Sequence, residues 1–583
     1  MWQTISLHPL SGWLDTRSRP ADVPPGGLRW KQNFAISPTA QLLRRGGHAR
    51  FYSDAESYAN HDYHRQGKPR EVVSFGMEST SSDGTRRLFI GTQSTVSVLN
   101  PSSGQWTDIV SGKGASGSQW RGAELQDTLI LTNNVDDILA YDIVGGGAPS
   151  TVGDLKNVLH VSKAKLVIEF GGFILLMNVV QDGDRQMSRV LWSDLNLPED
   201  WDPAKGSPDV TSLAGMQDLD YGDEILAAAP MLGALYICTR RSIWRVTVSG
   251  DADSVFSFNR VYNEPKNQTG CLAYPNTLIS TGTEHWYMGR DGVYNYNPYI
   301  PTPDRQEWMY RASGFMFSGT GLDSRYCQSP VGGYVPDSRE LWFSWPSTDA
   351  LGVNNWTLVA QVELKTADVV DTGYTMLTNF RRAPAETGQC NEVQDFIGAS
   401  GVDWALKSIG KVFYREYASL ADPSDKTVDL PEDANYSLTG YNSILRGLIP
   451  LEYADREKIV RRTLVGQDSA IEDEPCVMRL RIGNSKFIVD ANAEGDTGVP
   501  LWRVINFWDQ KPYGTLQAPE QTKASVLQSK NLRTSNDMVW PSYEQGAYLY
   551  FELTVTNRDG SPAIGGDVAI QRIDFEAMAL PKR

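Results

Sequence analysis

The sequence feature that most constrains the fold is a hairpin pattern that recurs along most of the chain. Each copy holds short apolar runs followed by a run with two-residue alternation, which places alternate side chains on opposite faces of a β-strand. Two neighbouring copies lie between Gly222 and Pro298, and in the second of them Gly289-Arg290-Asp291-Gly292 separates two such runs as a tight hairpin turn does. Each copy therefore predicts a small antiparallel sheet.

The copies follow one another at a loose spacing. Subtracting the positions of seven apolar anchor residues gives steps of 41, 45, 61, 51, 55 and 55 residues. A repeat of this length, about one four-stranded sheet per step, is typical of a β-propeller. We expect seven blades rather than six or eight, and hairpins in stacked sandwiches are the alternative. The anchors are Leu88, Leu129, Ile174, Leu235, Trp286, Leu341 and Phe396.

Three parts of the chain differ in character. Residues 1–50 are rich in Pro and Gly with little periodicity, so they predict an extended N-terminal arm. Residues 51–425 carry the repeat and are predicted to form the β-propeller. Residues 426–583 carry longer strand candidates and predict a C-terminal β-rich platform domain, similar to a β-sandwich and separate from the propeller. The predicted fold class is all-β.

Two details of the platform follow from the sequence. In the last strand candidate, Val568 to Leu580, the alternation slips by one residue near Arg572, which predicts a β-bulge. The arm before Phe51 is too polar and irregular to bury a core of its own, so it is expected to lie on the platform. The arm and the platform together are then the predicted assembly surface.

The charge balance limits the partners. The chain has 54 Lys and Arg against 70 Asp and Glu, a formal net charge of −16. Gripping nucleic acid through its phosphates needs a surplus of basic side chains, so this mode of DNA binding is not expected. The most apolar segments fall short of the roughly 20 residues that span a bilayer, and the N-terminus lacks a signal-peptide pattern, so membrane insertion is not expected either.

The cysteines indicate free thiols made in a reducing cytosol. There are five, an odd number, and none has the spacing of a C-x-x-C motif. They are Cys238, Cys271, Cys327, Cys390 and Cys476.

No motif meets the full requirements of a chemical site. Gly112-Lys113-Gly114-Ala115-Ser116-Gly117 has the glycine spacing of a dinucleotide-binding turn, but the sequence predicts neither a leading strand nor a following helix, so we expect an inter-blade loop. His61 and His64 lack a third ligand at a defined spacing. The acidic turns Asp182-Gly183-Asp184 and Asp251-Ala252-Asp253 lack the other positions of a calcium loop and read as hairpin turns.

An enzyme is not expected. A glycosidase with paired carboxylates would be the most plausible one on this scaffold, but the abundance of Asp and Glu is no signal for such a pair. The sequence therefore assigns no catalytic, cofactor-binding or metal-binding residue, and no cofactor. Five tryptophans in the apolar runs are expected to pack between blades rather than to stack on sugars. They are Trp192, Trp244, Trp286, Trp342 and Trp345.

Several short motifs follow one another along roughly residues 10–300. Most of them are expected to be turns or packing elements. They are Pro24–Gly27, Asn33-Phe34, Arg44–Gly47, Trp192-Ser193-Asp194 with Pro198-Glu199-Asp200-Trp201, Ser242–Val246, Thr269-Gly270-Cys271 and Gly289–Tyr294. In this order the chain resembles bacteriophage tail-nozzle proteins, also called tail tubular protein B, which combine a β-propeller with a platform domain.

The resemblance implies a structural component of a phage tail. It would be a nozzle or tail tubular ring that extends the DNA channel and docks other tail proteins, such as an adaptor, fibres or spikes. The implied assembly is a homo-oligomeric, hexameric ring in the virion, made in the bacterial host cytoplasm, through which genomic DNA passes during ejection without specific binding. The alternative is a propeller receptor-binding protein that binds or cleaves host glycans.

Overall fold

The structure is a computed structural model, and its described elements are almost all β-strands. Two short α-helices occur among them, α2 (Gly153–Asn157) and α3 (Glu307–Ala312). The described residues are 2–7, 14–18, 27–36, 42–44, 48–50, 75–91, 94–99, 106–115, 118–205, 212–251, 254–266, 269–300, 302–317, 321–335, 339–348, 354, 356–370, 406–409, 412–416, 443–448, 458–468, 476–483, 506–507, 536–546, 550–557 and 569–580.

Six four-stranded antiparallel units follow one another along the chain, each built from strands consecutive in sequence. The first three are β6 (Phe75–Thr80) to β9 (Trp106–Val110), β10 (Arg121–Leu125) to β13 (Ser150–Thr151), and β14 (Val161–Phe170) to β17 (Gly215–Asp218). The next three are β18 (Ile225–Met231) to β21 (Ser254–Asn263), β22 (Ile279–Ser280) to β25 (Asp304–Arg305), and β26 (Val331–Val335) to β29 (Thr366–Val370).

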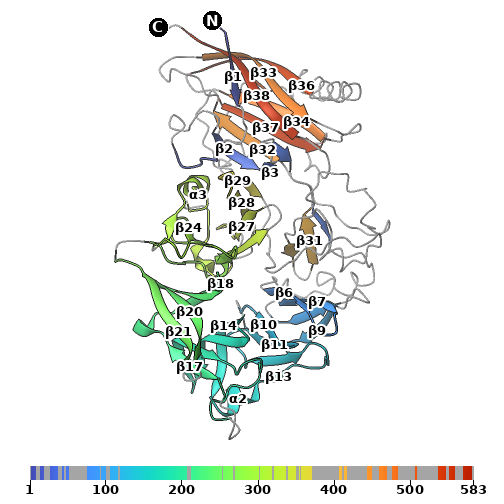
Figure 1. Ribbon diagram of the computed structural model, residues 1–583. Coiled ribbons are helices and arrows are strands. Elements are labelled where there is room, and N and C mark those ends of the chain that lie inside the picture. Colours follow the sequence, from blue (N-terminus) through green and yellow to red (C-terminus); the bar gives the residue numbers. More distant parts are fainter. Residues whose placement is uncertain are drawn as a thin grey trace.

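These units are the blades of a β-propeller. The first strand of each blade contacts the first strand of the next, from β6 through β10, β14, β18 and β22 to β26, so the first strands surround a common axis. A separate apolar core fills each of the five gaps between these consecutive blades. Figure 1 shows the blades running around the lower part of the molecule in chain order, from blue through green to yellow. The predicted propeller is therefore confirmed.

A seventh sheet completes the series and joins distant parts of the chain. β30 (Leu406–Ile409) pairs with β31 (Val412–Glu416), and β31 pairs on its other edge with β5 (His48–Arg50). Seven successive sheets agree with the expected number of blades. β5 lies in the segment predicted as an extended arm, and the structure pairs these residues with β31. The anchor at Phe396 lies outside the described residues.

The platform consists of two sheets that share a core. One sheet holds β1 (Gln3–Leu7), β3 (Phe34–Ile36), β4 (Leu42–Arg44), β38 (Ala569–Ala579), β33 (Lys458–Asp468) and β36 (Asn536–Gly546). The other holds β2 (Leu28–Gln32), β32 (Ser443–Leu448), β37 (Tyr550–Asn557), β34 (Cys476–Gly483) and β35 (Asn506–Phe507). Phe551 of one sheet and Phe575 of the other are buried with ring centroids 5.2 Å apart, which gives a sandwich-like pairing.

The second platform sheet continues into the propeller. β29 of the sixth blade pairs in parallel with β2 through Val369 and Gln32, so a single sheet of nine strands runs from β26 to β35. The backbone N–H of Asn33 donates to Val369 O at 2.9 Å, and buried Lys31 donates through Nζ to Thr366 Oγ1 at 3.0 Å. The platform predicted as separate is joined to the propeller by backbone pairing. The limits near residues 50 and 425 stay predictions as boundaries of independently folding units.

The predicted irregularity in the last strand is confirmed. Arg572 of β38 pairs with Gly466, but the next partner, Gln467, pairs with Ile570, so Gln571 is the extra residue of a bulge. The 3-10 helix η3 (Pro275–Thr277) lies just before β22.

The backbones of the fifth and sixth blades approach closely at Gly332, which gives a testable prediction. A Cβ at this position would lie 2.8 Å from the backbone oxygen of Thr277 and 2.8 Å from Ile279 Cγ1. Gly332→Ala should therefore destabilise the chain by about 1–3 kcal/mol through overpacking, measured by urea unfolding. Gly153→Ala at the start of α2, where the nearest atom is 4.0 Å away, is the matched control and should be neutral or slightly stabilising. Equal effects of the two substitutions would contradict this view of the blade interface.

Candidate functional site

Polar side chains from three blades meet across the propeller axis. Gln119 and Arg121 stand at the start of β10, Asn276 lies in η3 just before β22, and Gln328 lies just before β26. The second and fifth blades are not neighbours in the ring, so contacts between their residues cross the axis. This axial network lies where the innermost strands begin.

The amides of the axial network satisfy one another. Asn276 Nδ2 donates to Gln119 Oε1 at 2.8 Å and to the backbone oxygen of Gln328 at 2.6 Å. Gln119 Nε2 donates to the same oxygen at 2.8 Å, and Arg121 Nη2 donates to Asn276 Oδ1. Burial lowers the pKa of Arg121 to about 10, which still leaves the guanidinium charged at neutral pH. The network ties the second, fifth and sixth blades together and obstructs the axis.

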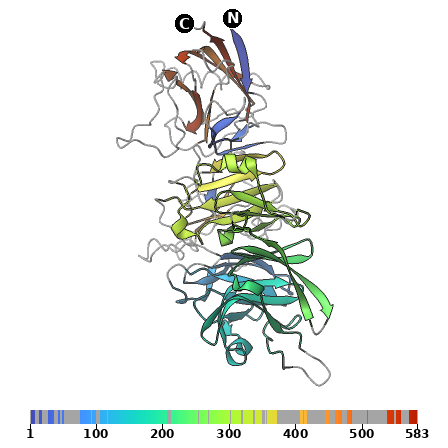
Figure 2. The same ribbon diagram turned by 90° about the vertical axis from the view of Figure 1, so that its left-hand side faces the viewer.

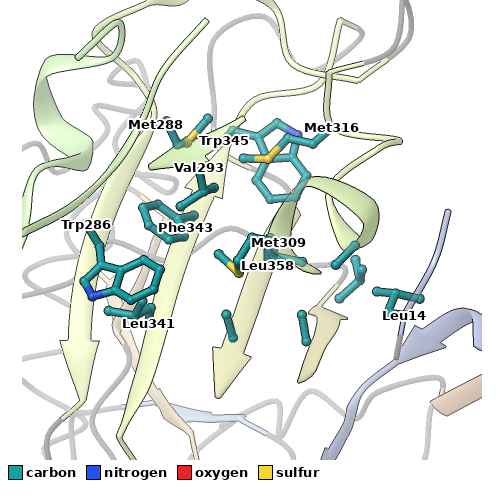
Figure 3. Close-up of a cluster of buried hydrophobic side chains, with 14 of the residues drawn as sticks. Leu14, Trp286, Met288, Val293, Met309, Met316, Leu341, Phe343, Trp345 and Leu358 are labelled. Atoms are coloured by element: carbon teal, nitrogen blue, oxygen red, sulfur yellow. The ribbon is translucent and has the colours of Figure 1, made fainter. Parts of the chain in front are cut away.

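The core between the fifth and sixth blades also receives the N-terminal segment. Figure 3 shows side chains of both blades and of α3 converging, with Leu14 at the edge of the cluster. Trp30 of β2 is 1% exposed, and its ring lies edge-on against Phe315 and Trp356, with centroids 5.1 and 6.1 Å away. Its Nε1 donates to Gln32 Oε1 at 2.9 Å. Part of the predicted arm is thus built into the propeller core.

The segment before β2 is fixed against helix α3. The backbone N–H of Thr16 donates to Arg311 O at 3.1 Å. The guanidinium groups of Arg17 and Arg305 lie 3.6 and 4.0 Å from the centroid of the Tyr310 ring, a cation–π arrangement. These contacts, with the pairing of β1 and β4 to β38, place the N-terminal segment on both the propeller and the platform.

The sequence motifs that could suggest a chemical site lie in loops and hairpins. The strand β9 ends just before Gly112, so the expectation that no strand leads into this segment was wrong. The next element is the strand β10 and not a helix, which confirms an inter-blade loop. Asp182 and Gly183 both have positive φ between paired residues of β15 (Phe173–Gln181) and β16 (Asp184–Trp192), which confirms a hairpin turn. Asp251 ends β20 (Ser242–Asp251) and pairs with Ser254, whereas Ala252 and Asp253 lie outside the described residues. His61 and His64 lie outside the described residues.

Two of the motifs that carry the family resemblance act as structural elements. Trp201 is buried between the second and third blades, and its Nε1 donates to Pro198 O at 2.9 Å. In the fifth blade, the hairpin turn residue Asp291 accepts from Thr269 Oγ1 at 3.1 Å and from Tyr294 Oη at 2.8 Å. Each of these motifs fixes a turn or a blade contact.

The tryptophans and cysteines behave as the sequence indicated. All five strand tryptophans are buried, and Trp192, Trp244, Trp286 and Trp345 belong to the cores between blades. Cys238, Cys271 and Cys327 are free thiols, and the first two are buried. Burial raises the pKa of Cys238 to about 12, so this thiol is protonated and unreactive at neutral pH.

His285 of β23 (His285–Met288) predicts a pH dependence of stability. It is 1% exposed, with its ring edge-on against Tyr236, and burial lowers its pKa to about 4. Between pH 6.5 and 4 the unfolded chain binds a proton that the folded chain does not, so this residue should cost about 3 kcal/mol of stability as the pH falls. We expect the difference in Tm between the wild type and His285→Gln to shrink over this range. A constant difference would contradict the assignment.

Among the described residues, no group of three or more His, Cys, Asp or Glu side chains is placed to hold a metal ion. No described helix is long and apolar enough to cross a membrane.

No family model matches this chain, and no curated protein matches it. Among solved structures, BamB from Moraxella catarrhalis is 11% identical over 66% of this chain and 94% of its own length, with a TM-score of 0.33. The Pan2 WD40 domain of Neurospora crassa is 9% identical over 66% and 97%, with a TM-score of 0.34. The extracellular domain of a one component system from B. thetaiotaomicron is 12% identical over 54% of this chain, which spans only 38% of that protein, with a TM-score of 0.30. At these TM-scores the matches carry no inference, and the propeller assignment rests on the strand pairing above.

Proposed function

We propose that this chain is a structural component of a bacteriophage tail, forming a nozzle or tail tubular ring that extends the DNA channel and docks other tail proteins. The observation that carries the proposal is the nine-stranded sheet, which joins propeller and platform into an elongated unit with both termini at the platform end (Figure 2). A ring that lengthens a channel needs subunits that do not bend between their domains. The motif resemblance supplies the tail role, and its motifs are turns and blade contacts rather than chemical groups.

In this proposal DNA passes between subunits and not through the propeller. The axial network of Gln119, Arg121 and Asn276 side chains obstructs the propeller axis. Each basic contact to phosphate would add a salt-dependent grip on moving DNA, whereas a net charge of −16 leaves carboxylates to line the channel. Only charges within roughly 8 Å of the DNA act strongly at physiological salt, so the carboxylates must face the ring axis.

We further propose that the chain is not an enzyme. The candidate motifs within the described residues act as turns and loops, and the buried Cys238 thiol and His285 imidazole are held in their neutral forms at pH 7. The purified chain should therefore release no sugar from host polysaccharides.

Electron cryomicroscopy of the purified full-length chain tests the proposed function. The expected result is a closed hexameric ring whose axis-facing wall is more acidic than its outer surface, with Lys and Arg concentrated at subunit contacts. A monomer or a trimer would overturn the ring, and specific binding or cleavage of host polysaccharide would favour the receptor-binding alternative. A basic or neutral lumen would remove the physical link between composition and DNA passage.

A further inference from the structure

Arg121 is a cation in the protein interior, and among the described residues it has no carboxylate partner. A guanidinium has five N–H donors. In the described part of the chain, that of Arg121 makes one hydrogen bond, to the neutral Asn276 side chain, and no ion pair. Burial is the sole cause of its lowered pKa, since no carboxylate acts to raise it. The side chain keeps some contact with solvent, as expected for a group that faces the axis.

Several other basic residues of the blades are paired with carboxylates, whereas Arg185 of β16, within the described ranges, donates only to Asn178. Lys165 and Arg240 both contact Glu224, at 2.8 and 2.6 Å, across the third and fourth blades. Arg189 of β16 pairs with Asp218 of β17 at 2.6 Å. A buried charge without a partner is costly, and hydrogen bonds to neutral amides offset only part of the cost. Arg121 therefore has both the charge and the spare donors for an anion.

The neighbours of Arg121 restrict what the anion can be. Each nitrogen and oxygen of the Gln119 and Asn276 side-chain amides has at least one hydrogen-bond partner within the network, so these side chains are held in place. Both side chains are neutral, so the guanidinium of Arg121 is the group that determines the charge of the ligand. A planar guanidinium binds carboxylate and phosphate oxygens in a two-point arrangement.

We propose that the propeller axis holds a small oxyanion, a carboxylate or a phosphate, bound by Arg121 at the end where the innermost strands begin. The bound anion compensates the charge of Arg121 and fastens the second blade to the fifth across the axis. This site does not depend on the proposed tail role, because it lies within one chain.

Thermal unfolding and calorimetric titration of the full-length chain test the site. Inorganic phosphate and acetate are titrated separately, with chloride adjusted to keep the ionic strength constant. The expected result is a saturable rise in Tm with at least one of them, and the one that acts identifies the ligand class. Arg121→Gln should weaken binding by about tenfold or more, since it removes a charge-assisted hydrogen bond. The same substitution should raise Tm in anion-free buffer, because it removes an unpaired buried charge.

Two further variants separate the site from general effects of charge. Arg189→Gln makes the same change of charge at an ion pair of the outer strands and should keep the full response to the anion. Arg121→Lys keeps the charge without the two-point geometry and should bind more weakly than wild type but more tightly than Arg121→Gln. An equal response of wild type and Arg121→Gln, or no saturable response of the wild type to either anion, would overturn the proposal.

Discussion

Deleting residues 1–45 should abolish the folded platform and destabilise the propeller as well. The deletion removes β1, β3 and β4 from one platform sheet and β2 from the middle of the nine-stranded sheet. It also removes Leu14 and Trp30 from the core of the fifth and sixth blades. An arm that only lay on the platform would leave an intact propeller after its deletion, whereas the strand pairing requires that both parts lose structure.

The loss can be followed by limited proteolysis and by calorimetry. We expect the truncated chain to be cleaved rapidly within residues 426–583 and to unfold at a clearly lower temperature than the full chain. The matched control lacks only residues 1–7, which removes the single strand β1 paired with β38, and should keep the nine-stranded sheet. If the longer truncation unfolded with the same Tm and still formed the same assembly, the N-terminal strands would not be structural.

Trp30→Ala should produce the largest effect of any single substitution considered. The indole is buried against Phe315 and Trp356 at the point where β2 meets the sixth blade. Truncating a buried Trp to Ala typically costs about 3–5 kcal/mol, because apolar contacts are lost and a cavity remains. The measurement is the shift of the urea unfolding midpoint that reports on the propeller.

The control for this substitution is an exposed aromatic residue in the same part of the fold. Tyr299, in the loop before β25, is 83% exposed, so Tyr299→Ala should change the stability by no more than about 0.5 kcal/mol. Similar effects at Trp30 and Tyr299 would mean that the junction does not contribute to the stability of the propeller.

The local alternation of apolar and polar residues determined the blades. Side chains on successive residues of a strand face opposite ways, so the alternation of Ile243–Val248 indicates a strand, and the short apolar run Leu235–Cys238 indicates a buried one, without any knowledge of their partners. The turn at Gly289–Gly292 and the bulge beside Arg572 were predictable for the same reason, because both depend on residues close in sequence. The local pattern does not indicate β36, because Pro541 lies inside it and a proline argues against a strand.

The tertiary structure decided which distant segments meet. The local sequence pattern of β2 does not indicate that it pairs with β32 and β29. The pattern of β5 likewise does not indicate pairing with β31. The reason is that the backbone groups at an exposed strand edge can pair with strands of many sequences. The axial network was missed in the same way, although Gln119, Asn276 and Gln328 each stand two or three residues before the first strand of a blade. The common position of these residues before an innermost strand could have indicated the network. Recognising it requires the arrangement of the blades around an axis, because only that arrangement brings the starts of the innermost strands together.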